Sequence, residues 1–147
     1  MKTKMNILIA SLLSATALVA ADKPDPKLVA QGRLLFQTKI CFTCHQADPA
    51  IITPAGLALK APKFIGDFWG KKRKVQLDAN PDTPVFEPSG KFVDVLLDDK
   101  YFLESVEKPM LKVLKDSIPA MAPLPTTLKE RKALLAYVKS LSKKPKK

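Results

Sequence analysis

The sequence predicts a single all-α domain with long irregular loops, and three observations favour it. Its 147 residues, 46% of them hydrophobic and 27% charged, suit one globular domain without a second core. Helix-start signals stand near both ends, at Asp25-Pro26 and at Thr127–Glu130. Over residues 46–70, proline and glycine recur without a sustained period, which is typical of loops.

Residues 1–21 look like an export signal and not like part of the fold. Lys2 and Lys4 precede an uncharged, mostly apolar run over residues 5–19, and small residues suited to a signal peptidase end the segment. The uncharged stretch is short for a bilayer span, so we expect cleavage, with a retained anchor helix as the alternative. Residues 22–147 would then form one periplasmic domain without a transmembrane segment.

The first predicted helix begins at Asp25-Pro26, an N-cap residue followed by proline at the first helical position. It should end near Lys39, with Phe36 on its apolar face and Gly32 in its middle. Glycine inside a helix costs about 0.5–1 kcal/mol relative to alanine. Its presence therefore indicates the close approach of another helix.

The middle of the chain favours a short β-hairpin insertion near residues 72–97. Two short stretches, 75–77 and 92–95, alternate between apolar and polar residues, as strands with one buried face do. Residues 78–91 would form an irregular connection between them.

The last third of the chain is predicted to be helical. Asp98 can cap a helix that Pro109 ends, and a further short helix is expected over residues 111–115. Thr127 and Glu130 form a capping box. The apolar residues of the helix that follows recur at i, i+4 and i+7: Leu134, Val138 and Leu141.

Both cysteines and the only histidine fall within Cys41-Phe42-Thr43-Cys44-His45. Cys-x-x-Cys-His is the attachment sequence of a c-type haem. We therefore expect one haem c, joined by two thioethers to Cys41 and Cys44, with its iron bound by His45. Three other uses suit the chain less well. A thioredoxin-like redox pair needs a βαβ setting, a disulfide here closes too short a loop, and zinc needs further ligands.

The second axial ligand to the iron should be a methionine, because no other histidine exists. Met110 and Met121 are the candidates in the mature chain, and either could instead be a core filler. Prolines around Met121 stiffen the loop before the last helix, so we favour Met121. His/Met ligation fills both axial positions, which favours an electron carrier over an enzyme.

The chain resembles the class I, mitochondrial-type cytochromes c. Gly32 and Phe36 match the family's glycine and aromatic residue on the N-terminal helix, and residues 134–137 match its C-terminal helix. The resemblance implies an all-α fold in which these helices cross beside a covalently bound haem. Ala61-Pro62 stands where the family usually has Gly-Pro. The Pro62 carbonyl would then accept the Nδ1–H of His45.

A closer resemblance is to the cytochrome c domain fused to some bacterial cytochrome c oxidase subunits II. Residues 64–71 and 98–109 match segments of that domain, and the spacing from Pro109 to Met121 fits it. Residues 78–91 look like an insertion. Three loop positions depart from the family pattern: Pro49, Ala61 and Ala122.

The formal charge of +11, from 25 basic and 14 acidic residues, has two explanations that remain open. The lysines could simply keep a small protein soluble, or they could steer it to an acidic partner. A Lys-rich tail occupies residues 143–147. Nucleic acid is not an expected partner, because the chain is exported and has no recognised nucleic-acid-binding motif. The candidate docking residues form one basic run: Lys71, Lys72, Arg73 and Lys74.

The sequence thus predicts an exported monohaem c-type cytochrome that passes single electrons between periplasmic or membrane-bound redox proteins. The donor would be a reductase or dehydrogenase, and the acceptor an oxidase. Two alternatives remain. One is a cytochrome subunit held permanently on a periplasmic dehydrogenase. The other is a haem sensor or enzyme in which Met121 does not ligate and the iron is open.

Overall fold

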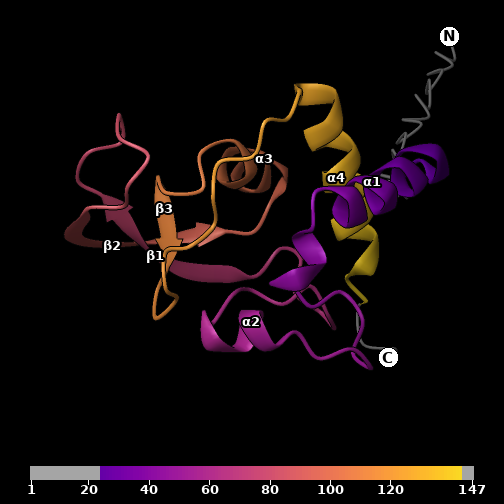
Figure 1. Ribbon diagram of the computed structural model, residues 1–147, viewed down its shortest axis with the longest axis horizontal. Helices are drawn as coiled ribbons and strands as arrows, with labels where there is room; N and C mark the ends of the chain where they lie inside the picture. Colours follow the sequence, from indigo (N-terminus) through magenta and orange to yellow (C-terminus); the bar gives the residue numbers. More distant parts are fainter. Residues whose placement is uncertain (1–23, 144–147) are drawn as a thin grey trace, which may run out of the picture.

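The computed structural model describes residues 24–143. The export signal predicted over residues 1–21 lies outside this range, as does most of the Lys-rich tail. Figure 1 shows α1 and α4 together at one end of the molecule and the strands at the other, with α2 and α3 between them. The helices and strands follow in the order α1 (Pro26–Thr38), η1 (Cys41–Thr43), α2 (Pro54–Ala58), β1 (Lys72–Asp78), β2 (Pro88–Leu96), α3 (Asp99–Glu107), β3 (Lys112–Leu114) and α4 (Leu128–Leu141).

The terminal helices α1 and α4 begin where their capping residues predict. The Asp25 carboxylate accepts the Lys27 amide at 2.8 Å, and Pro26 opens α1. At α4 the Thr127 side chain and the Glu130 carboxylate accept each other's backbone amides, which completes the capping box. These local hydrogen bonds explain why both helix starts could be predicted from sequence alone.

The two terminal helices pack together at Gly32. A Cβ added there would overlap the Ala133 carbonyl oxygen and would lie only 2.7 Å from Cβ of Tyr137. The predicted close approach of a second helix at this glycine is therefore confirmed. The crossing continues into one core, whose buried residues come from both terminal helices, from α3 and from the loops between them: Phe36, Phe64, Phe68, Leu97, Phe102, Val106, Leu134 and Val138.

The prediction of an all-α fold is wrong, because the chain also contains a three-stranded antiparallel sheet in the order β2-β1-β3. The hairpin expected near residues 72–97 does form, with Val75 opposite Val93. It is not an isolated insertion, however. β1 lies in the middle of the sheet, its Val75 side chain is fully buried, and the sheet forms one wall of the cavity described below.

The short helix expected over residues 111–115 is also wrong. Residues 112–114 instead form β3, in which Leu114 lies opposite Val75 and Lys112 opposite Leu77. Five residues form little more than one helical turn, whose nucleation is unfavourable without further support. Residues 112–114 instead pair with the edge of β1 that β2 leaves free. This pairing satisfies their backbone hydrogen-bonding groups and buries Val113, so the contact with a distant segment decides the local structure.

No helix within residues 24–143 is long and apolar enough to cross a bilayer.

Candidate functional site

A cavity of about 300 Å³ lies between the end of α1, the sheet, α3 and the loop that precedes α4. This volume falls at the lower end of the roughly 300–1,000 Å³ range of ligand pockets. Most of the lining is apolar, and the few polar or charged side chains on it include Arg73, Tyr101 and Lys112. Cys41, Cys44, His45, Met110, Met121 and Pro62 all line this one cavity, so the fold brings the predicted site residues together.

The two cysteines sit on a tight turn at the end of α1. Ile40 adopts a left-handed backbone conformation with φ of 53°, which reverses the chain, and the 3₁₀ turn η1 begins at Cys41. The His45 amide then donates to the Cys41 carbonyl at 2.9 Å. Both thiols are free and partly buried, and burial raises the pKa of Cys41. The turn therefore brings two thiols and an imidazole to the same cavity wall.

His45 is held in one orientation by the loop that follows α2. Its Nδ1 lies 2.9 Å from the Pro62 carbonyl oxygen, the contact that the family resemblance predicts. A carbonyl can only accept, so Nδ1 carries the hydrogen and Nε2 keeps its lone pair for a ligand. The ring also stacks on Phe64 at 5.0 Å between centroids. Burial lowers the pKa of His45, which favours the neutral imidazole that metals bind.

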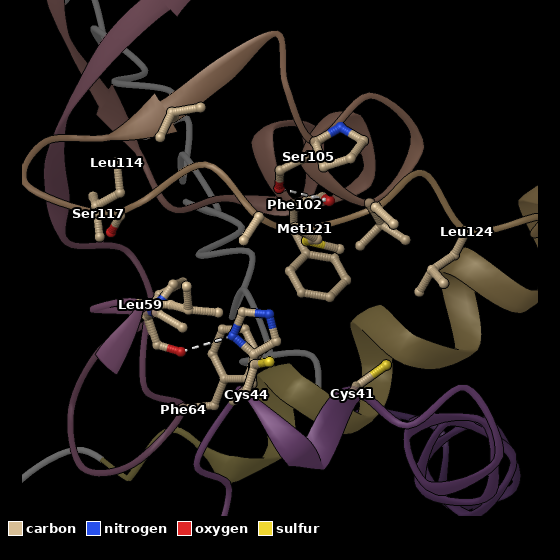
Figure 2. Close-up of a pocket in the computed structure, with 18 of the residues that line it drawn as sticks. Cys41, Cys44, Leu59, Phe64, Phe102, Ser105, Leu114, Ser117, Met121 and Leu124 are labelled. Atoms are coloured by element: carbon tan, nitrogen blue, oxygen red, sulfur yellow. Dashed lines mark hydrogen bonds between the residues drawn. The ribbon is translucent and has the colours of Figure 1, made fainter. Parts of the chain in front are cut away.

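Met121 lies on the side of the cavity opposite the two cysteines (Figure 2). Its loop is fastened at both ends. The Ile118 amide donates to the Leu59 carbonyl at 3.0 Å, and the Lys39 ammonium donates to the Pro125 carbonyl at 3.0 Å. Met110 lines the same cavity but also a smaller one of about 120 Å³ beneath the β1–β2 connection. Both methionine side chains therefore reach the cavity, and Met121 does so from a loop that is held at both ends.

Gly56 is a site-supporting residue that the sequence pattern did not single out. A Cβ at this position would overlap the Cys44 carbonyl oxygen and lie 2.7 Å from Oγ1 of Thr53. The helix α2 therefore packs its backbone directly against the Cys-x-x-Cys-His turn. In the sequence, only the position of Gly56 two residues after Pro54 could have indicated this contact. That signal is weak, because glycines are common in loops.

Arg73 does not share a surface with the lysines beside it. Its side chain lines the cavity, whereas Lys72 and Lys74 on either side are exposed, as strand alternation requires. Burial lowers the pKa of Arg73, and none of the ion pairs within residues 24–143 includes it. A partly buried cation without a carboxylate partner is costly, so this guanidinium suits a bound group that carries negative charge.

No protein-family model matches the chain, and no curated protein matches it either.

Proposed function

We propose that the chain is an exported, monohaem c-type cytochrome that transfers single electrons between periplasmic or membrane-bound redox proteins. One observation carries the proposal. Two free thiols and a histidine oriented through Nδ1 line the same mainly apolar cavity, with a methionine on its opposite side. Each of these groups has a role in haem attachment or iron ligation, and their sequence spacing is that of the c-type motif.

The residues of the cavity fit a haem and would divide its binding between them. Cys41 and Cys44 would form the two thioethers, and His45 and Met121 would bind the iron from opposite sides. The haem, when bound, supplies a one-electron redox couple. The Pro62 carbonyl fixes the imidazole, and the apolar walls from α3 and the loop before α4 would keep water away from a bound iron.

Electron transfer suits this set of ligands better than chemistry on a substrate. With both His45 and Met121 bound to the iron, no position on it would be left for oxygen or another small molecule. An apolar wall further disfavours the entry of polar substrates. We therefore propose an electron carrier and not an enzyme.

The absorption spectrum of Met121→Ala tests this proposal most directly. In the wild-type chain produced with a haem-maturation system, we expect the weak long-wavelength sulfur-to-iron band in the oxidised form. The variant should lose this band, become high-spin and bind carbon monoxide when reduced. Met110→Ala is the matched control, because Met110 lines the same cavity. Loss of the band in the control instead of the variant would contradict the assignment of Met121.

Arg73→Met should have opposite effects on stability before and after haem attachment. Without haem, the variant no longer buries an unpaired cation, so the free energy of unfolding should rise by about 1 kcal/mol. With haem, whose two carboxylates can pair with Arg73, the same change should lower it by roughly 1–3 kcal/mol.

Urea unfolding of both forms measures this difference. Arg131→Met is the control, because Arg131 is already paired with Glu107 at 3.1 Å and bonded to the Thr126 carbonyl at 2.7 Å. It should destabilise both forms. A change of the same sign at Arg73 in both forms would show that its charge does not pair with the bound group.

A second candidate function is a cytochrome subunit held permanently on a dehydrogenase. Three large apolar side chains beside and within α2 favour it, because they are more than half exposed: Ile51, Ile52 and Leu57. Such a cluster suits a stable protein interface. A monomeric mature chain that stays soluble at high concentration would count against this candidate.

A further inference from the structure

The pairing of the strands divides the basic run of residues 71–74 between two faces of the sheet. Arg73 and Val75 belong to the face that borders the cavity and the core. Lys72 and Lys74 belong to the opposite face and are exposed. The basic residues of this run therefore do not form one surface patch. Lys72 and Lys74 instead share a face with residues of the neighbouring strands.

The register shows which neighbours these are. Leu96 lies opposite Lys72, and Asp94 lies opposite Lys74. On the other side of β1, the Lys115 amide donates to the Lys74 carbonyl at 2.9 Å, which continues the pairing of Leu114 with Val75. We call this surface the outer sheet face, and its exposed residues are Lys72, Lys74, Phe92, Asp94, Leu96 and Lys115.

The outer sheet face carries more positive charge than its own contacts balance. Lys74 and Lys115 are cross-strand neighbours of like charge, a pairing that destabilises a sheet. None of the ion pairs within residues 24–143 includes Lys72, Lys74 or Lys115. An anionic group placed over this row would remove the repulsion.

The same face also exposes large apolar side chains between its lysines. Phe92 is 48% exposed and Leu96 is 47% exposed, although both lie on an ordered strand. Aromatic side chains are enriched at protein interfaces, where charged residues form a rim around an apolar centre. The composition of the outer sheet face therefore fits a protein partner.

We propose that the outer sheet face docks an acidic redox protein. The position of Asp94 beside Lys74 favours a protein over an anionic lipid surface, because a uniformly negative surface would repel this carboxylate. The place of the sheet fits electron transfer, because its other face lines the cavity through Arg73, Lys112 and Leu114. A partner on the outer face is thus separated from the cavity by a single layer of sheet. The redox nature of the partner rests on the proposed function.

The test is a titration of the ¹⁵N-labelled mature chain with flavodoxin, an acidic one-electron protein, followed by amide chemical shifts. We expect shifts centred on β1, β2 and β3, and a Kd that rises with salt. Replacement of three outer-face lysines (Lys72→Gln, Lys74→Gln and Lys115→Gln) should raise the Kd by about tenfold or more. The control removes three exposed charges from the terminal helices: Lys27→Gln, Lys129→Gln and Lys132→Gln. It should change the Kd by less than about threefold.

Three results would overturn the docking surface. These are shifts centred on α1 or α4, equal losses in the two triple variants, or tighter binding to phosphatidylglycerol vesicles than to flavodoxin. Glutamine introduces no new charge, and thermal unfolding of both variants shows whether they fold equally well. The spectrum of the same sample reports the haem separately. Docking on the outer sheet face without haem would contradict the proposed function alone, and haem without such docking would contradict only this inference.

Discussion

Replacement of both Cys41 and Cys44 by serine should abolish covalent haem attachment completely. A serine hydroxyl cannot form the thioether, so the denatured polypeptide should carry no haem on a gel stained for it, whereas the wild-type chain should stain. Each single variant should retain at most one bond and stain weakly. The loss of covalent haem should be complete, because the chain has no other cysteine that could form a thioether.

The control for this prediction lies between the two cysteines. Phe42→Ser changes a side chain that is about half exposed and leaves both thiols and His45 in place. It should retain full covalent haem and the wild-type spectrum. Haem staining of the double serine variant, or a colourless wild-type chain from a working maturation system, would refute the proposed cofactor.

Gly32→Ala should cost at least about 3 kcal/mol of the free energy of unfolding, the upper end of the usual cost of overpacking. An alanine in mid-helix is intrinsically better than glycine by about 1 kcal/mol, so any loss must come from the tertiary contact. The new Cβ would overlap the Ala133 carbonyl oxygen and lie 2.6 Å from its carbon. Both atoms are backbone, so relief requires the helices α1 and α4 to move apart.

Urea unfolding of the variant with and without haem measures this cost, and Gly90→Ala provides the comparison. Gly90 has φ of +75° and no atom within 4 Å of an added Cβ, so this second change adds only backbone strain, about 1–2 kcal/mol. A Gly32→Ala chain as stable as the wild type would show that the helices do not cross here as closely as described.

The parts of the fold that the sequence predicts are those set by local chemistry. The N-caps of α1 and α4 are hydrogen bonds between residues two or three apart, and they are visible in the sequence at Asp25 and Thr127. The Cys-x-x-Cys-His motif is equally local. Gly32 indicates a distant contact because glycine is otherwise unfavourable in a helix.

The parts of the fold that the sequence does not predict depend on contacts between distant segments. β3 has only three residues, and nothing in Lys112–Leu114 itself shows that β1 will pair with it. The register of a sheet decides whether a basic residue faces solvent or a cavity, so Arg73 could not be separated from Lys72 and Lys74 before the strands were placed. Gly56 supports the site through the Cys44 backbone, a contact that no spacing rule describes.

The fastening of the loop before α4 has a consequence for how this chain tolerates change in length. The backbone returns at Ser117 and Ile118 to the point that it left at Leu59 and Lys60, where hydrogen bonds of 2.6 and 3.0 Å join them. Residues 61–116 therefore form a segment whose two ends are held together by these hydrogen bonds. Lengthening its connection at 79–87 would add closure entropy only slowly, about 0.6 kcal/mol for each doubling of a flexible loop. Evolution can thus enlarge or trim this connection while the cysteines and Met121 keep their places.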